Sequence, residues 1–344
     1  MDFKKLFSLF SPDLAVDLGT ANTEVLVVGK GIVIKEPTIC AINKKTKGII
    51  AIGSEAKTML GKTPPSISVI RPLKDGVISD YEVAEKFLAH YIKKVCESSK
   101  PLFGISKPRI VLGVPSGITE VERRAVSEAA MSAGARRAYL LEEPMAAAIG
   151  AGLPVLEARG SMIVDIGGGT TEIAVISYGG IVVAKSLKTA GYEIDQKIIE
   201  ISKDRYNLLI GESTAEGVKI VIGSVYEPKK DSVYILKGRS LETGLPESRE
   251  VSSYDIFEAI IIPVKQIIEA VKDTIQETPP ELVADILKDG ITISGGGSEL
   301  LGFDKLLSRE AKIPIHKAAD PATCVVRGCA KVLEDPSLLG KVKI

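Results

Sequence analysis

Residues 162–182 read MIVDIGGGTTEIAVISYGGIV, and residues 14–33 read LAVDLGTANTEVLVVGKGIV. The two stretches are copies of one pattern. At a single constant offset they share an aspartate, a glycine, a threonine, a glutamate and a valine, which form the pairs Asp17/Asp165, Gly19/Gly167, Thr23/Thr171, Glu24/Glu172 and Val27/Val175. Repetition of a long pattern indicates a duplicated structural unit. The sequence therefore predicts two related halves.

Each copy has the pattern of a β-hairpin with a polar tip. A β-branched, apolar run ends in an aspartate, a glycine-containing turn follows, and a second alternating run leads to another glycine turn. Glycine lets backbone N–H groups approach an anion, and an ionised aspartate can hold a metal ion. The alternative is a plain hairpin whose glycines only form the turn, but two copies with aspartate in the same place disfavour it. We expect a magnesium nucleotide, ATP above others, to bind at these hairpins.

Composition and charge limit the class of protein. The 344 residues are 45% hydrophobic and 26% charged, which suits a globular chain with two domain-sized cores. Forty-four basic residues balance forty-four acidic ones, so no global field attracts nucleic acid, and we expect no nucleic-acid partner. The four cysteines form no C-x-x-C pair, and the two histidines are far apart. This pattern favours buried cysteines in a reducing compartment and disfavours a histidine-rich metal site.

The cellular location follows from two further observations. The longest apolar runs are much shorter than the roughly 20 residues that a membrane-spanning helix needs. No signal peptide with a small-residue cleavage site is visible. We therefore expect a cytoplasmic protein.

A glutamate stands out in the segment between the two copies. The strand pattern of residues 109–117 precedes a capping box formed by Thr119 and Glu122, which predicts a helix ending at Gly134. A short strand at 139–141 then leads to Glu143 and an alanine-rich helix. A carboxylate at this helix entrance can orient water, although a residue that merely complements the helix dipole is the alternative.

The segment after the second copy ends in a glycine loop. Residues 254–276 have the apolar period of a core helix, which we expect to bend at Pro263, and the helix ELVADILK follows. The strand ITI at 291–293 then runs into the loop 294–298, which reads SGGGS. Such a loop lets backbone approach the α-phosphate and base of a nucleotide, with packing alone as the alternative. Alternation of strands and helices predicts an α/β fold.

Eight segments together resemble the MreB family of bacterial actins, within the ATPase superfamily of actin, sugar kinases and heat-shock chaperones. They span nearly the whole chain and are DLGTANT at 17–23, IRPLKDGVISDYEVAE at 70–85, VPSGITEVERRA at 114–125, EEPMAAAIGAGLP at 142–154, DIGGGTTEIAVIS at 165–177, LIGESTAEGVKIVIG at 209–223, TPPELVADI at 278–286 and SGGGSELLGFD at 294–304.

The resemblance implies an actin-like, bilobed α/β fold, in which two ribonuclease-H-like domains enclose a nucleotide cleft. Domain I would comprise residues 1–152 and 319–344, with a small subdomain at about 37–71. Domain II would comprise residues 153–318, with a small subdomain at about 190–254.

The resemblance also implies roles for individual residues. The residues expected to bind the terminal phosphates are Thr20, Ala21 and Asn22 in domain I and Gly167, Gly168, Gly169 and Thr170 in domain II. Asp17 and Asp165 would hold magnesium through water, and Glu143 would polarise the attacking water. The residues expected near the adenosine are Glu216, Lys219, Gly295, Gly296, Gly297 and Ser298.

Two residues depart from the family pattern. Tyr192 stands where relatives carry a small or acidic residue near the ribose, which puts ribose contacts at that position in doubt. Gly217 lies inside an expected helix and weakens it by roughly 1 kcal/mol relative to alanine.

The resemblance further implies a slow ATPase that forms cytoskeletal filaments when ATP binds. Such filaments determine cell shape by organising cell-wall synthesis. The expected partners are other copies of the chain, the inner face of the cell membrane and cell-wall elongation proteins. A small-metabolite kinase of the same superfamily is the alternative, but it needs a substrate pocket, for which the sequence shows no distinct motif.

Two apolar segments are candidates for membrane contact. The first has its apolar residues at helical spacing beside two lysines, and these residues are Phe3, Leu6, Phe7 and Phe10. A disordered terminus or a packing segment is the alternative. The second comprises Leu102 and Phe103, in a loop bounded by Pro101 and Pro108 that resembles the membrane-inserting loop of the family. Many weak contacts along a filament would add up through effective concentration.

Overall fold

The computed structural model describes residues 13–74, 76–98, 107–228 and 232–342. The chain divides into two compact units. Unit 1 comprises Met1–Ala158, Ile176–Ile181 and Ala322–Ile344, and unit 2 comprises Arg159–Val175 and Val182–Pro321. The domain bounds expected from the sequence stay a prediction, and Ile176–Ile181 of unit 1 lies inside the expected domain II.

The first repeated hairpin forms the middle of a five-stranded sheet in unit 1. The strand order is β10-β9-β1-β2-β3. Strand β1 runs parallel to β9 and antiparallel to β2. The bounds are β1 Leu14–Leu18, β2 Asn22–Val27, β3 Gly31–Pro37, β9 Arg109–Val114 and β10 Arg137–Glu142. The chain leaves β9 at Val114, so residues 115–117 of the predicted strand belong to the following turn.

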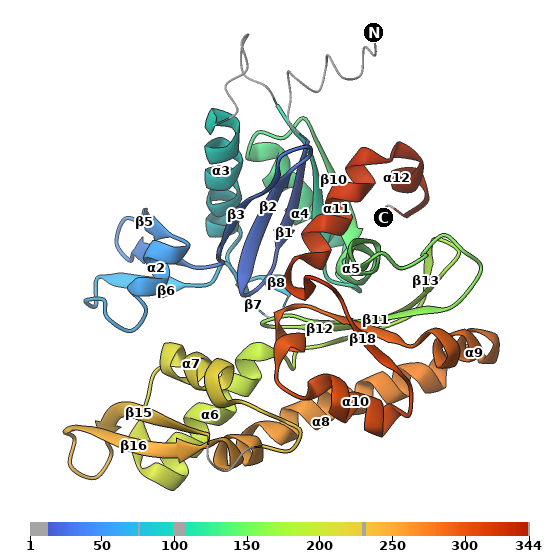
Figure 1. Ribbon diagram of the computed structural model, residues 1–344. Helices are drawn as coiled ribbons and strands as arrows, with labels where there is room; N and C mark the ends of the chain where they lie inside the picture. Colours follow the sequence, from blue (N-terminus) through green and yellow to red (C-terminus); the bar gives the residue numbers. More distant parts are fainter. Residues whose placement is uncertain (1–12, 75, 99–106, 229–231, 343–344) are drawn as a thin grey trace. The chain divides into compact units, whose positions relative to one another are not determined.

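Five helices accompany this sheet, and their bounds are α3 Tyr81–Ser98, α4 Glu120–Ser132, α5 Glu143–Ala151, α11 Cys324–Glu334 and α12 Pro336–Val342. The predicted capping box at the start of α4 is confirmed, because the Thr119 hydroxyl accepts from the Glu122 backbone N–H and the Glu122 carboxylate accepts from the Thr119 backbone N–H. Helix α11 contacts β1, β9 and α5, and Figure 1 shows it beside α5. Phe87 and Tyr91 of α3 are fully buried and belong to the same core cluster as Leu14 and Leu112 of the sheet.

Smaller elements complete unit 1. A three-stranded sheet of order β5-β4-β6 carries the short helix α2, and β7 pairs with β8. Their bounds are β4 Cys40–Asn43, β5 Ile49–Ile52, α2 Ser54–Thr58, β6 Ile67–Ile70, β7 Leu73–Lys74 and β8 Val77–Ile78.

The second repeated hairpin lies in a five-stranded sheet of order β13-β12-β11-β17-β18. The bounds are β11 Ser161–Ile166, β12 Thr171–Ser177, β13 Gly180–Leu187, β17 Ile291–Ser294 and β18 Ile315–Lys317. Strand β17 runs parallel to β11 and β18. Read from β18 to β13, this order matches the order from β10 to β3 in unit 1. The prediction of two halves with one pattern is confirmed.

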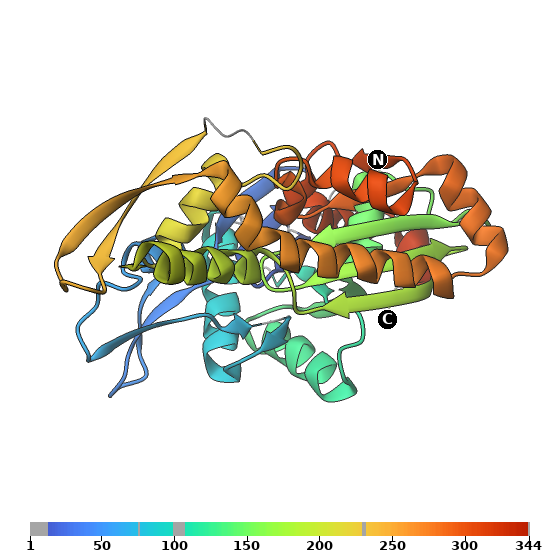
Figure 2. The same ribbon diagram turned by 90° about the horizontal axis from the view of Figure 1, so that it is seen from below.

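Helices and a small sheet surround this second core. Their bounds are α6 Gly191–Tyr206, β14 Leu208–Leu209, α7 Glu212–Ile222, β15 Val233–Ser240, β16 Pro246–Ser252, α8 Ser253–Glu277, α9 Pro280–Asp289 and α10 Phe303–Ala311. Ile260, Val264 and Ile267 of α8 join the same buried cluster as Val164 and Val175 of the sheet. Figure 2 shows α8, in orange, running across the strands of this sheet. Helix α8 remains one helix through Pro263.

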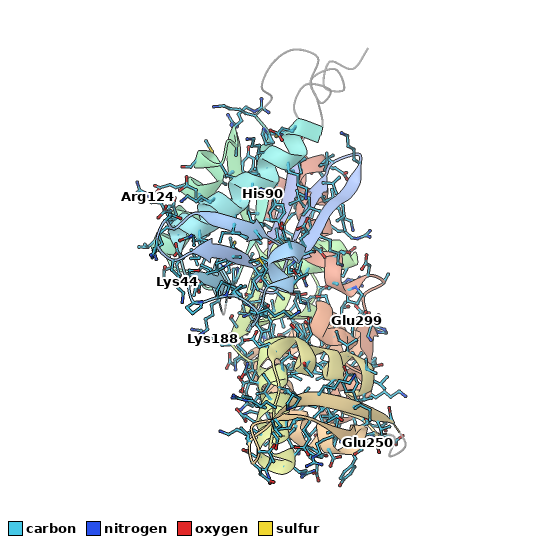
Figure 3. The ribbon with its side chains drawn as sticks, turned by 90° about the vertical axis from the view of Figure 1, so that its left-hand side faces the viewer. Lys44, His90, Arg124, Lys188, Glu250 and Glu299 are labelled. Carbon is cyan, nitrogen blue, oxygen red and sulfur yellow. The ribbon has the colours of Figure 1, made fainter. Side chains whose placement is uncertain are left out.

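Exposed charges of both signs cover the described surface. Figure 3 labels three of the exposed basic residues and two of the exposed acidic ones, namely Lys44, Arg124, Lys188, Glu250 and Glu299. Within the part of the chain that the structure describes, no helix combines the length and the apolar character needed to cross a membrane. The candidate membrane residues Phe3, Leu6, Phe7, Phe10, Leu102 and Phe103 lie outside the described residues.

Candidate functional site

Asp17 and Glu143 lie around one point in unit 1. Asp17 is the fourth residue of β1, and its register partner on β9 is Gly113. Glu143 is the first residue of α5, directly after β10, which pairs with the other side of β9. A methyl group on Gly113 would lie 3.5 Å from Glu143 Cγ and 4.0 Å from Asp17 Oδ1. The sheet order thus brings together two carboxylates that are far apart in sequence.

Glu143 lies buried at the entrance of α5. Glu142 is the N-cap residue, and its side chain makes no capping hydrogen bond. Glu143 is only 9% exposed, in the first turn of the helix. Below it, burial and the charges of Asp17 and Glu143 raise the pKa of the Cys329 thiol well above its ordinary value. This geometry suits a carboxylate that orients water beside Asp17.

The turn after Asp17 is braced by a residue that the sequence did not single out. The Thr38 hydroxyl donates to the Gly19 carbonyl oxygen at 2.6 Å, and the Thr38 backbone N–H donates to the Ala21 carbonyl oxygen at 2.9 Å. The Thr20 hydroxyl accepts from the backbone N–H of Gly76 at 3.3 Å. Asn22, the first residue of β2, is exposed. No pattern in the sequence marks Thr38, because its partners are backbone atoms of a turn about twenty residues away and the Thr23 hydroxyl, which lies 2.8 Å from the Thr38 hydroxyl.

Asp165 occupies the corresponding place in unit 2. It is paired in register with Ser294 of β17, whose hydroxyl donates to Asp165 Oδ1 at 2.6 Å. Burial raises the pKa of Asp165 to about 6, the Ser294 hydrogen bond lowers it, and the charge of Glu172 raises it. A pKa near 6 leaves the carboxylate mainly ionised at neutral pH, so a nearby cation would find a negative charge.

The glycine turn after Asp165 meets the start of α6. The backbone N–H of Gly191 donates to the Gly167 carbonyl oxygen at 3.2 Å, and that of Tyr192 donates to the Gly168 carbonyl oxygen at 2.8 Å. Gly169 and Thr170 are buried in the same turn. The turn is therefore fixed by backbone contacts, which suits a preformed anion-binding loop.

Lys219 joins this turn from α7. Its Nζ donates to the Gly191 carbonyl oxygen at 3.0 Å and lies 2.9 Å from Asp195 Oδ1. Asp195 is 4% exposed, and burial raises its pKa to about 6, whereas Lys219 lowers it and Glu216 raises it. The predicted residues Glu216 and Lys219 thus lie near one another. The sequence analysis did not predict Asp195 as a site residue. A carboxylate at one of the otherwise apolar positions of α6 could have indicated it.

The glycine loop 295–298 packs against the end of β11. A side chain on Gly295 or Gly297 would overlap Ile166, which lies between Asp165 and Gly167. The Ser298 hydroxyl is buried and donates to the Gly295 carbonyl oxygen at 2.7 Å. A methyl group on Gly296 would meet nothing within 4 Å. Packing therefore accounts for Gly295 and Gly297, and Gly296 is the position with open space for a ligand.

Comparison with known proteins agrees with this geometry. The family model described as MreB/Mbl protein matches residues 11–341. The cell shape-determining protein MreB of Escherichia coli strain K12 is 49% identical over 335 residues, which cover 96% of each chain. The cell shape-determining protein Mbl of Bacillus subtilis strain 168 is 45% identical over 336 residues, which cover 98% of this chain and 100% of that protein.

Solved structures show the same likeness. The crystal structure of MreB5 of Spiroplasma citri bound to ADP matches with a TM-score of 0.90 and 37% identity, over 96% of this chain and 98% of that one. The same protein bound to AMPPNP matches with a TM-score of 0.88. The fold is therefore actin-like, and the chain belongs to the MreB/Mbl family.

Proposed function

We propose that this chain binds and slowly hydrolyses ATP, assembles into filaments and helps to determine cell shape. The duplicated aspartate–glycine hairpin carries the proposal, because each half of the chain places a carboxylate at the end of a central strand and a glycine turn directly after it. The membership of the family supports the role in cell shape, and the nucleotide-bound structures of MreB5 support nucleotide binding.

Both half-sites would act on one nucleotide. The turn of Thr20, Ala21 and Asn22 would contact the terminal phosphates, and so would the turn of residues 167–170. Backbone N–H groups and hydroxyls are suitable donors for phosphate oxygens. Glu216, Lys219 and Gly296 would lie near the adenosine, with Gly295, Gly297 and Ser298 holding the loop that carries Gly296 in place.

Magnesium fits the donors that are present. Among the described residues, no group of three or more His, Cys, Asp and Glu side chains could hold a metal ion. Mg²⁺ in nucleotide sites keeps several waters and needs only one or two carboxylates beside the phosphates. Asp17 and Asp165 meet this requirement, because each is a carboxylate at the end of a strand next to a phosphate-binding turn. The bound ion would neutralise charge on the phosphates.

Glu143 would direct the hydrolysis step. Its carboxylate, which approaches Asp17 over Gly113 of β9, would hold the attacking water and accept its proton or orient it toward the γ-phosphorus.

Filament assembly and membrane attachment would be coupled. The segment with Phe3, Leu6, Phe7 and Phe10 and the loop with Leu102 and Phe103 would each insert weakly into the inner face of the cell membrane. Repetition along a filament raises the effective concentration of these contacts. Cell-wall elongation proteins would be the partners that are organised by the position of the filament.

A metabolite kinase is not favoured. The family match covers residues 11–341, and the relatives at 49% and 45% identity are cell shape-determining proteins. Electron microscopy of the purified chain with ATP, with ADP and without nucleotide tests the proposal, together with phosphate release in the same samples. We expect filaments and slow phosphate release with ATP and magnesium. Absence of filaments, or ATP consumption only after a sugar or an acid is added, contradicts it.

A further inference from the structure

Gly113 lies on the strand that separates the two carboxylates of unit 1. In the order β10-β9-β1, its register partners are Leu141 on one side and Asp17 on the other. Glu143, the first residue of α5, lies two residues after Leu141. The side chain of Glu143 can therefore approach Asp17 only over the backbone of β9, at a position that has no side chain.

Three side chains border the space over Gly113. A methyl group there would lie 2.8 Å from Val325 Cγ1, 3.5 Å from Glu143 Cγ and 4.0 Å from Asp17 Oδ1. A separation of 2.8 Å between the added methyl carbon and Val325 Cγ1 is shorter than a van der Waals contact between two carbon atoms. Val325 is β-branched and lies on α11, so its rotamer is restricted.

Helix α11 is packed closely against α5 near Val325. One turn beyond Val325, a side chain on Gly328 would already overlap the Ala146 carbonyl oxygen of α5. Helices α5 and α11 therefore touch through their backbones at this point. Extra volume at position 113 would fall among Val325, Glu143 and Asp17.

The duplicated half of the chain provides an internal comparison. Asp17 is paired with Gly113, and the equivalent Asp165 is paired with Ser294 on the equivalent strand β17. In unit 2 the Ser294 hydroxyl fills the space and donates to the aspartate at 2.6 Å. In unit 1 the same place is empty of side chain and is bordered by the carboxylate of α5. The two halves thus differ at the register position beside the aspartate.

We propose that Gly113 is a positioning residue for ATP hydrolysis, because the missing side chain lets the Glu143 carboxylate stand beside Asp17. This inference rests on the proposed ATPase activity.

The test compares phosphate release and ATP affinity in Gly113→Ala, Val325→Ala and the double variant. Removing Cγ1 and Cγ2 of Val325 relieves the 2.8 Å clash but leaves the methyl group beside Glu143. For Gly113→Ala and the double variant we expect kcat to fall at least about tenfold, with the Kd for ATP changed less than about threefold. Val325→Ala alone should keep its turnover. Gly340→Ala, which adds a methyl group in open space on α12, is the matched control.

The outcomes separate the inference from the proposed function. If the unaltered chain releases no phosphate from ATP, the proposed function fails. If the unaltered chain is active and Gly113→Ala is equally active, the inference fails. Full recovery of kcat in the double variant also overturns it, because Gly113 then only accommodates Val325. If Gly113→Ala does not fold, the kcat of the double variant decides: a loss of turnover supports the inference, and normal turnover overturns it.

Discussion

Single buried carboxylates set the chemistry of unit 2. Asp165 and Asp195 both have a pKa raised to about 6, with burial as the main cause. Their stabilising partners differ, since Asp165 accepts from a neutral hydroxyl and Asp195 pairs with Lys219. The ammonium group of Lys219 already supplies a positive charge to Asp195. Asp165 is the carboxylate that gains most from an added metal ion.

Nucleotide binding should therefore depend on the ionisation of Asp165. Folding raises its pKa from 3.8 to about 6, so in the free protein its contribution to stability is present below 3.8 and is lost as pH rises through 6. Binding of Mg²⁺ has the opposite dependence, because it requires the ionised form. We expect the affinity for Mg–ATP to fall as pH drops below about 6, measured as Kd against pH.

Ser294→Ala provides the control for this pH dependence. The variant removes the hydrogen bond that lowers the pKa of Asp165, so the fall in affinity should begin at a higher pH than in the unaltered chain. ATP itself titrates in this range, but identically for both proteins. Coinciding Kd profiles for the two proteins contradict the assignment of Asp165.

Glu143 and its neighbour Glu142 allow a matched pair of substitutions. Glu143→Ala should still bind ATP but release phosphate at least about a hundredfold more slowly, because a positioned acid–base group contributes that much. Glu142→Ala removes the same charge one residue earlier, where no capping hydrogen bond is lost, and should keep its turnover. Phosphate release in single-turnover assays measures both. Normal turnover of Glu143→Ala places the catalytic role elsewhere.

At the scale of elements, helices α5 and α11 form the base of the unit 1 half-site. Lys331 of α11 donates to the Ile149 carbonyl oxygen at 2.8 Å, at the C-terminal end of α5, where a cation complements the helix dipole. A side chain on Gly150 would overlap the backbone of Cys324, just as one on Gly328 would overlap Ala146. Both ends of α5 are thus fixed, which holds Glu143 in position.

Gly328→Ala and Gly340→Ala should change stability in opposite directions. Alanine at 328 forces two helices apart at a backbone contact, and we expect a loss of about 3 kcal/mol in the free energy of unfolding. Alanine at 340 is exposed on α12, and its better helix propensity should raise stability by about 0.5 kcal/mol. Urea unfolding of both variants checks the prediction. A Gly328→Ala protein as stable as the unaltered chain would show that α11 can shift.

At the scale of the whole molecule, membrane attachment should depend on assembly. With ATP and magnesium, the chain should sediment with liposomes, and deletion of residues 1–11 should remove most of that binding. The deletion removes the four candidate membrane residues Phe3, Leu6, Phe7 and Phe10 together with Lys4 and Lys5. Filament formation by the shortened chain, followed by electron microscopy, is the control. Equal sedimentation of both chains contradicts a membrane role for this segment.

The sequence by itself determined the features that are local or repeated. The duplicated hairpins, the capping box of Thr119 and the position of Glu143 at the start of a helix all follow from residues close together in the chain. Such patterns are readable because turn chemistry and hydrophobic periodicity act over a few residues. The resemblance of the eight segments to the MreB family extended the prediction from local features to the family and the fold.

Only the tertiary structure decided which distant residues share a site. Sheet order placed Gly113 between Asp17 and Glu143, and register gave Asp165 the Ser294 hydroxyl. Thr38 bracing a turn and Asp195 pairing with Lys219 belong to the same class. Their partners are backbone atoms or residues on other elements, and strand pairing and helix packing fix those distances. No local pattern in the chain carries that information.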